Sequence, residues 1–256
     1  MPSRKELRLC SARKNVLKLK LKPNDEKQLK LLVSIFVILQ VFNYLMREVA
    51  YTLFTYIFII TSCLFCMLLS DGSKSYRYTQ IALIATVGAD FFLVFLPFQL
   101  KVPGVLCFCV TQFSYFMRIW SEDENGIRKK VHLILRVAIS VFGLIITILV
   151  LGIRLDVLSL ISVLYYANLI LNLIFSYLQF NKMRILAIAL SLFIVSDTLL
   201  GFDNLSSYLL IPRGSVIYLI TRVGGGFVMP LYLAAHILIP LSLFSRKRKA
   251  LMKATA

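Results

Sequence analysis

Two aspartates in apolar stretches of this 256-residue sequence are its best candidates for chemistry. Asp90 lies in the stretch 78–96 and Asp197 in the stretch 183–202. A carboxylate in hydrocarbon costs about 2.5–3.5 kcal/mol, so it normally faces a bundle interior or a watery cavity. At about 1.5 Å per helical residue, both lie roughly 8–9 Å from the same end of their stretches. Two acids at one depth, one protonated and one ionised, would suit acid–base chemistry. The alternative interpretation is that each acid only bonds a neighbouring helix.

Other apolar stretches carry polar residues that could surround this pair. Five of them fall on one helical face at spacings of three and four, and they are Tyr165, Asn168, Asn172, Ser176 and Gln179. A stripe of this length favours the lining of a cavity, whereas a lone Asn would be interhelical glue.

Three further stretches carry smaller groups at helical spacing. These are Gln112 with Tyr115, Tyr232 with His236, and Gln40 with Asn43 and Tyr44. A lone histidine in a membrane helix is usually a hydrogen-bonded packing residue, so His236 is a functional candidate only because of the two acids.

The composition identifies the elements that must position these residues. Hydrophobic residues make up 59% and charged residues 16%, and the mean hydropathy is +0.82. Ordinary soluble domains are about 45–50% apolar and about 25% charged. Lipid must therefore cover the excess apolar surface, which excludes a soluble enzyme, a disordered protein and a fibrous protein.

Eight stretches are long enough to span a membrane, since a spanning helix needs about 20 apolar residues. They are residues 29–46, 49–70, 78–96, 100–120, 131–153, 157–178, 183–202 and 224–244. We therefore predict an all-α, polytopic transmembrane bundle of eight helices. It would have a basic arm at 1–28, a membrane domain at 29–245 and a basic tail at 246–256. Because 216–222 is also apolar, the last span could instead be one long helix broken at the glycines 224–226.

The basic residues predict the orientation. Of the 29 Lys and Arg, 24 fall on the inner side and 5 on the outer side if the N-terminus is inside. This bias predicts a multi-pass protein of the cell membrane with both termini cytoplasmic. It also explains the net charge of +17 by topology and by anionic lipids at the arm and tail, and not by nucleic acid. The first span is expected to be an uncleaved anchor, because no small-residue cleavage site follows it.

The cysteines and short motifs indicate no metal and no organic cofactor. Cys63 and Cys66 lie in one span, Cys107 and Cys109 in another, and Cys10 in the arm. Inside apolar helices such spacing is more typical of free thiols than of a disulfide or zinc site. The sequence has no Gly-x-Ser-x-Gly and no His-Glu-x-x-His motif. The glycines 224–226 favour a helix break or close packing over phosphate binding.

A weak repeat relates the two aspartate stretches. Residues 89–95 and 196–202 both read small residue, Asp, two residues, Leu, one residue, Phe. Two parallel four-helix halves would produce this pattern, and such halves often place a site at their interface.

These motifs resemble the YhhN family of lysoplasmalogenase-like membrane proteins. Members have eight spans, with a Gly-Asp type motif in the third and a Ser-Asp-x-x-Leu motif in the seventh. Residues 196–200 match the latter, and Gly88-Ala89-Asp90 matches the former with one inserted residue. Gln112 stands where the family's fourth-span His-x-x-Tyr pair has His, and His236 where its last span usually has Gln. A Lys-Pro pair usual in the second span is missing.

The resemblance implies an activity and a site. The activity is hydrolysis of the vinyl ether bond of lysoplasmalogen, giving a fatty aldehyde and a glycerophospho-alcohol. Asp90 and Asp197 would divide the roles of acid and of stabiliser or base. The residues expected to orient water or substrate are Gln112, Tyr115, Asn168, Asn172, Ser196, Tyr232 and His236. The ligand would be a lysophospholipid or another single-chain lipid.

Two other functions stay open at this point. Gln cannot replace His in acid–base work, so the departure at Gln112 favours a non-catalytic relative that binds lipid or senses the membrane. The parallel repeat is also compatible with a small transporter that uses the two acids as proton or cation sites.

Overall fold

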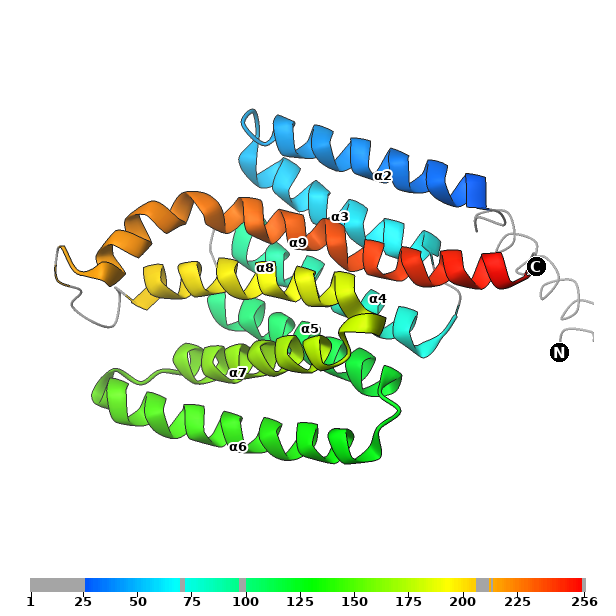
Figure 1. Cartoon of the computed structure of the whole chain (residues 1–256). Coiled ribbons are helices and arrows are strands. Elements are labelled where there is room, and N and C mark those ends of the chain that lie inside the picture. The colour runs from blue at the N-terminus through cyan, green and yellow to red at the C-terminus, as the bar shows by residue number, and fades with distance from the viewer. Residues whose placement is uncertain (1–25, 70–71, 97–99, 206–211, 213, 255–256) are drawn as a thin grey trace, which may run out of the picture.

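The structure is a computed structural model that describes residues 26–69, 72–96, 100–205, 212 and 214–254 (Figure 1). These residues form helices and short connections, with no strand among them. The α-helices are α2 (Glu26–Met46), α3 (Tyr51–Leu69), α4 (Lys74–Asp90), α5 (Lys101–Glu122), α6 (Gly126–Leu151), α7 (Val157–Leu178), α8 (Phe180–Leu205) and α9 (Val216–Ala254). A π-helical turn, Phe91–Phe95, extends α4. All eight are long and apolar enough to cross a membrane, which confirms the predicted all-α membrane bundle.

The predicted spans agree with the helices except at the last one. There the structure gives the alternative of one long helix, α9, which starts at Val216 and has no break at the glycines 224–226. The part of it that could cross a membrane is Arg222–Phe244, close to the predicted 224–244. The same helix continues through residues 246–254, which the sequence assigned to a tail. Of the predicted basic arm, only residues 26–28 are described, so Cys10 lies outside the described residues.

The helices alternate in direction, so that α2 begins and α9 ends at the same end of the bundle (Figure 1). We call this the chain-end side and the opposite end the far side. Lipid offers no hydrogen bonds to a backbone, so helices are the form in which these segments can cross it. Polar caps fix two turns: Asn125 accepts from the amides of Ile127 and Arg128 at the start of α6, and Asp156 forms a capping box with Ser159 at the start of α7.

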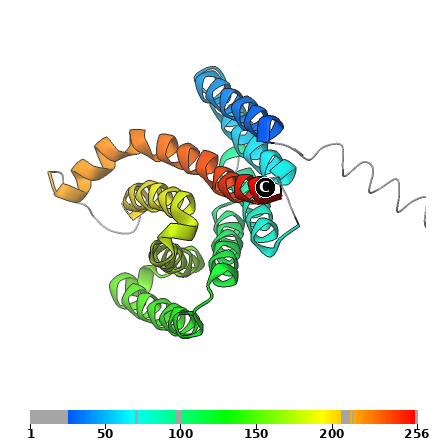
Figure 2. The ribbon, with the colours of Figure 1, turned by 45° about the vertical axis from the view of Figure 1, so that its right-hand side comes forward.

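The packing order of the helices repeats. In the first half α2 packs on α3, α3 on α4 and α4 on α5, and α6 to α9 pack in the same order in the second half. The fourth helix of each half then packs on the second helix of the other, α5 on α7 and α9 on α3 (Figure 2). This reciprocal pattern matches the two parallel four-helix halves that the aspartate repeat indicated.

Packing is tighter on the chain-end side than on the far side. On the chain-end side, large side chains such as Tyr76, Ile119 and Leu186 are fully buried. Toward the far side, residues 160–166 of α7, 197–199 of α8 and 228–231 of α9 are all partly exposed. The candidate site lies where the tight half of the bundle meets this looser one.

Two of the arginines assigned to the inner side are buried in the bundle. Arg118 belongs to α5 and Arg136 to α6, and they are 4% and 9% exposed. They therefore contribute to the interior of the bundle and not to a charged surface.

Candidate active site

Asp90 is the last residue of α4 and is only 3% exposed. The hydroxyl of Tyr232 on α9 donates to both of its oxygens, at 2.9 Å to Oδ1 and 2.7 Å to Oδ2. Tyr56 of α3 is close enough to interact with Asp90 electrostatically. The π-helical turn begins directly after Asp90, and its Phe95 packs against Tyr56 with ring centroids 5.0 Å apart. Such turns are frequent at functional sites because they change the direction of the following side chains.

Asp197 lies on α8 and is partly exposed. The hydroxyl of Tyr165 on α7 donates to its Oδ2. The neighbouring residues on the same two helices, Tyr166 and Thr198, share a second hydroxyl hydrogen bond. The orientation of α7 against α8 is thus fixed at two successive positions beside this carboxylate.

The structure brings the two carboxylates into one cluster. Asp90 and Asp197 interact electrostatically, and Tyr232 is influenced by both. Phe108 of α5 lies between the two phenols, with its ring centroid 5.7 Å from that of Tyr165 and 6.5 Å from that of Tyr232. The cluster therefore draws on both halves of the bundle.

The predicted polar residues of α5 and α7 link to this cluster. The amide nitrogen of Asn172 donates to the backbone carbonyl and to Oε1 of Gln112, at 2.8 and 3.0 Å. The side chain of Gln112 also lies near the hydroxyl of Tyr165. Asn168 donates to the carbonyl of Leu164, one turn earlier in the same helix.

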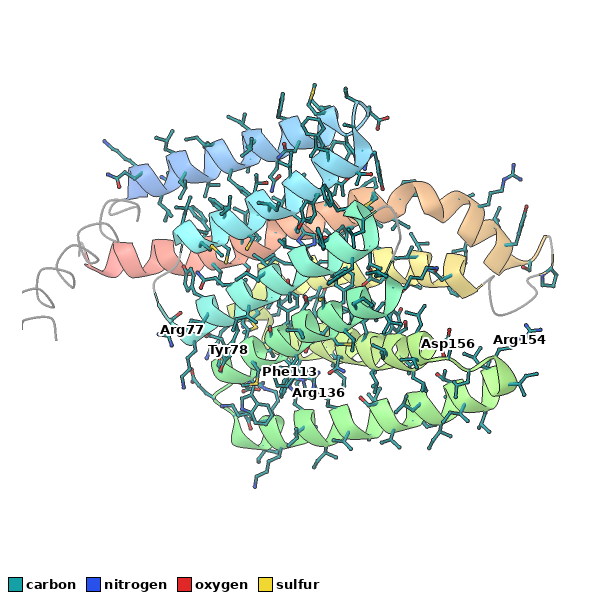
Figure 3. All side chains as sticks on the ribbon, turned by 180° about the vertical axis from the view of Figure 1, so that it is seen from behind. Arg77, Tyr78, Phe113, Arg136, Arg154 and Asp156 are labelled. Carbon is teal, nitrogen blue, oxygen red and sulfur yellow. The ribbon has the colours of Figure 1, made fainter. Side chains whose placement is uncertain are left out.

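Sequence reasoning missed Arg136 and His132 of α6. Arg136 donates to Oδ1 of Asn168 and, at 2.8 Å, to Oδ1 of Asn172. Its other contacts are Nε2 of His132 at 3.0 Å and the ring of Phe116 at 4.1 Å. Figure 3 shows Arg136 on the side of α6 that faces the bundle. The sequence did contain a signal for Arg136, namely a charged residue inside the predicted span 131–153. The two aspartates were identified by the same signal in their own spans.

The three remaining predicted residues are Tyr115, Ser196 and His236, and none of them hydrogen-bonds either carboxylate in the described chain. Tyr115 is fully buried, and its hydroxyl has no partner there. Ser196 donates to the carbonyl of Val228 at 2.9 Å, which joins α8 to α9. The ring of His236 packs on that of Tyr232 at 4.5 Å, but neither ring nitrogen has a partner among the residues described.

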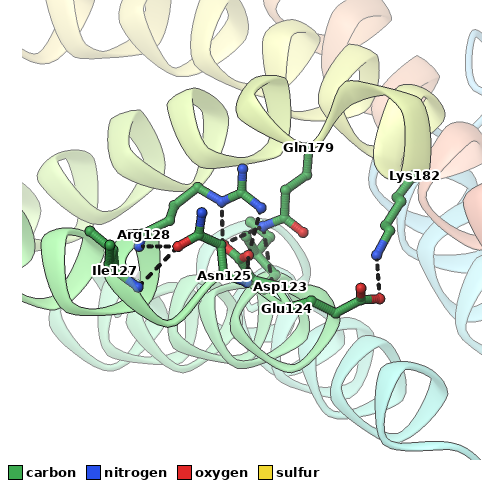
Figure 4. Close-up of polar contacts among 8 residues, drawn as sticks. Asp123, Glu124, Asn125, Ile127, Arg128, Gln179 and Lys182 are labelled. Carbon is green, nitrogen blue, oxygen red and sulfur yellow. Dashed lines mark hydrogen bonds and ion pairs between the residues drawn. The ribbon is translucent and has the colours of Figure 1, made fainter.

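The chain-end side of the polar stripe serves the connections between helices (Figure 4). Arg128 donates from two nitrogens to Asp123, at 2.5 and 2.6 Å, and Gln179 donates to Asp123 at 3.3 Å. The Arg128 guanidinium holds the pKa of Asp123 below its usual value. Lys182 pairs with Glu124 at 2.6 Å. These contacts tie the α5–α6 turn to the α7–α8 turn, beside a surface pocket of about 330 Å³ lined by Arg128 and residues 177–182.

No group of three or more His, Cys, Asp or Glu in the described parts of the chain could hold a metal ion. The arrangement instead offers two carboxylates, each with a phenol donor, at the loosely packed end of a membrane bundle. Such a pair can place a proton donor beside an ionised group.

The fold and this cluster define a multi-pass membrane protein with a candidate acid–base site between two helical halves. A model of the YhhN family matches residues 51–243, and the chain belongs to this family. The match runs from α3 into α9, so it includes both aspartates and Tyr232. No curated protein and no solved structure matches the chain.

Proposed function

We propose that this protein is an integral membrane hydrolase of the lysoplasmalogenase type, which cleaves the vinyl ether bond of a lysoplasmalogen. Family membership supports the class of reaction. The observation that carries the proposal is the pair Asp90 and Asp197, each hydrogen-bonded by a tyrosine and close enough to interact. We further propose the cell membrane as its location, with both termini cytoplasmic and with anionic lipids bound at the basic arm and tail.

The reaction consumes one water and needs no redox partner. The vinyl ether R–CH=CH–O–R′ is protonated at its β-carbon, which leaves an oxocarbenium cation. Water then adds to that cation and loses a proton, and the hemiacetal collapses to the aldehyde R–CH2–CHO and the alcohol R′–OH. The protein must therefore supply one proton donor and one anion beside the cation.

The two aspartates can supply these groups. A protonated carboxyl would deliver the proton to carbon, and an ionised carboxylate would stabilise the cation and accept the proton from water. Tyr232 and Tyr165 would hold the two carboxyl groups in position. Because α7, α8 and α9 are partly exposed beside Asp197, that side would admit water and a single-chain lipid. Gln112, Asn168 and Asn172 would act through these groups.

A second candidate function is lipid binding without turnover. It is favoured by Gln112, which stands where the family resemblance expects a histidine. Glutamine exchanges no proton near neutral pH, so a mechanism that required this group for proton transfer would fail here.

The experiment is a single-turnover incubation of purified protein in detergent with lysoplasmalogen, assayed for released fatty aldehyde. Wild type should release aldehyde and Asp197→Asn should not. The matched control is Asp156→Asn, because Asp156 caps α7 and Asn caps helices about as well. Absence of aldehyde from folded wild type would reject hydrolysis, and bound lipid found by mass spectrometry would then support the binding function.

A further inference from the structure

Arg136 is a buried cation at the middle of a membrane helix. It lies ten residues beyond the start of α6 at Gly126, which is about 15 Å along the axis. It is 9% exposed, and none of the ion pairs among the described residues involves it. Its partners are neutral groups: two asparagines, a histidine nitrogen and an aromatic face. A buried charge without a counter-charge is costly, so its retention calls for a role.

The hydrogen bonds that leave Arg136 have a fixed direction. A guanidinium can only donate, so Asn172 must turn its Oδ1 toward Arg136 and its NH2 toward Gln112. That NH2 donates to Oε1 of Gln112 at 3.0 Å. With its oxygen occupied in this way, Gln112 has its own NH2 free to turn toward the neighbouring hydroxyl of Tyr165. That hydroxyl donates its proton to Asp197.

The polar side chains therefore lead from a cation to a carboxylate through Asn172, Gln112 and Tyr165, with hydrogen bonds from Arg136 to Gln112 and from Tyr165 to Asp197. Gln112 and Tyr165 are neighbours between them. We call this series of residues the relay. Each donor in such a chain strengthens the next, and a hydrogen bond to an ionised acceptor is about twice as strong as a neutral one. A carboxylate is a stronger acceptor than a protonated carboxyl, so a donor that is supported in this way favours the ionised form of Asp197.

Asp90 has no comparable support. Its partner Tyr232 donates to both carboxyl oxygens, and in the described chain no hydrogen bond leads from Tyr232 to a cation. The two carboxyl groups, which occupy equivalent places in the repeat, are thus made unequal by residues outside the repeated motif.

We propose that Arg136 is a positioning residue that, through Asn172, Gln112 and Tyr165, keeps Asp197 ionised and leaves Asp90 to carry the proton. The roles that this assignment gives the two acids in catalysis rest on the proposed function. The protonation states themselves do not depend on any substrate, so they can be tested separately.

The test is infrared spectroscopy of the purified full chain at neutral pH, without substrate. In the wild-type background, Asp197→Asn should remove a carboxylate band, whereas Asp90→Asn should remove the band of a protonated carboxyl. In the Arg136→Gln background, Asp197→Asn should remove a protonated-carboxyl band instead, and Arg136→Lys should retain the carboxylate. A protonated Asp197 in the wild type, or a carboxylate that survives Arg136→Gln, would overturn the proposal.

Two further variants distinguish an effect of Arg136 through the relay from general destabilisation or loss of charge. Gln112→Met interrupts the chain while Arg136 remains, so it should also convert the Asp197 band, and it serves if Arg136→Gln fails to fold. Arg118→Gln removes another buried arginine, which bonds Thr79 and Ser242, and should leave the Asp197 band unchanged. Conversion of the band by Arg118→Gln would point to bulk charge and against the relay.

Kinetics distinguish this proposal from the proposed function. If the protein hydrolyses lysoplasmalogen, Arg136→Gln should lower kcat at least 10-fold with KM little changed, and Arg136→Lys should restore part of it. If no aldehyde forms but the infrared bands respond as expected, hydrolysis is rejected and the relay stands. If aldehyde forms and the bands do not respond, the relay is rejected and hydrolysis stands.

Discussion

The two halves of the bundle present the same aspartate motif but hold it differently. In the second half, the first helix carries Arg136, from which polar side chains of α7 and α5 lead to Asp197. In the first half, the corresponding helix α2 carries Gln40, whose bonds end on α3 at Phe58 and Ser62, 3.0 and 2.7 Å away. A repeat supplies two similar acids, whereas acid–base chemistry needs two unequal ones. The difference between the first helices can supply that inequality.

The two halves are alike where the aspartate helix meets the helix after it. A Cβ on Gly104 of α5 would lie 2.5 Å from Cγ of Leu93, and one on Gly224 of α9 would lie 2.5 Å from Cδ2 of Leu199. In both halves a glycine thus lets a leucine from the aspartate segment approach the next helix, although Leu93 is three residues after its aspartate and Leu199 two. The close approach is therefore common to the halves, whereas the leucine that makes it and the polar residues near the acids differ.

The largest expected effect comes from removing either acid. Asp90→Asn and Asp197→Asn should each lower the rate of aldehyde release about 10²–10⁴-fold, because each removes a group that moves a proton or faces developing charge. The measurement is single-turnover kinetics at neutral pH. If one variant kept the wild-type rate, the pair would not be the site.

The tyrosine partners of the two acids should differ in how much they contribute to kcat. Tyr165→Phe should lower kcat about 10- to 100-fold, because a bond to an ionised group contributes about 1.5–3 kcal/mol. Tyr232→Phe should lower kcat only about 2- to 10-fold, because a bond to a neutral carboxyl contributes about 0.5–1.5 kcal/mol. Steady-state kinetics on both variants provide the test. Equal losses would contradict unequal charge on the two acids.

Alanine substitutions at Gly104 and Gly224 test the close glycine–leucine contacts that both halves contain. Gly104→Ala should destabilise the protein by about 1–3 kcal/mol, because Cγ and both methyl carbons of Leu93 lie within 3.1 Å of the new Cβ. Gly224→Ala should cost less, because only Cδ2 of Leu199 comes closer than 3.4 Å and a methyl group can turn away.

The matched control is Gly225→Ala, since a Cβ there meets nothing within 4 Å. Alanine favours a helix over glycine by about 0.5–1 kcal/mol, so this variant should be no less stable than wild type. Thermal unfolding in detergent measures all three. A stable Gly104→Ala protein would mean that the contact with Leu93 is not tight.

The sequence predicted the bundle and the acid pair because both depend on single-chain signals. A run of about 20 apolar residues is enough to identify a span, and a carboxylate inside one is conspicuous. The rotation of each helix about its axis depends on its neighbours instead. For this reason the partners could not be predicted: Tyr165 faces Asp197, Tyr232 faces Asp90, and Tyr115 faces neither carboxylate.

Arg136 was missed for a related reason. The count of basic residues assigned it to the inner side as a topology signal, although it lies near the middle of α6 and is buried. The continuity of α9 was missed because three successive glycines indicate a break in an isolated chain. In the structure the helix continues through this point, and Gly224 is buried close to Leu199.

The smallest expected effect concerns Arg128, which, unlike Arg136, forms a direct ion pair with a carboxylate, that of Asp123. Arg128 lowers the pKa of Asp123 from its ordinary value of 3.8 by hydrogen bonding the charged form. A lowered pKa contributes stability above the ordinary value, and this contribution is lost as the pH falls through the lowered one. Asp123→Asn should therefore reduce stability by about 1 kcal/mol at pH 6, and the difference should vanish in acid.

Thermal unfolding of both proteins from pH 6 down to about pH 2, below the lowered pKa of Asp123, gives the comparison. Because this pair is direct and lies at a helix turn, its loss should leave the rate of aldehyde release at neutral pH unchanged. Arg136→Gln should do the reverse and change the rate at neutral pH while adding no such acid-dependent difference in stability. If Asp123→Asn slowed the reaction as much as Arg136→Gln, the effect of Arg136 would come from general loosening of the bundle and not from its link to Asp197.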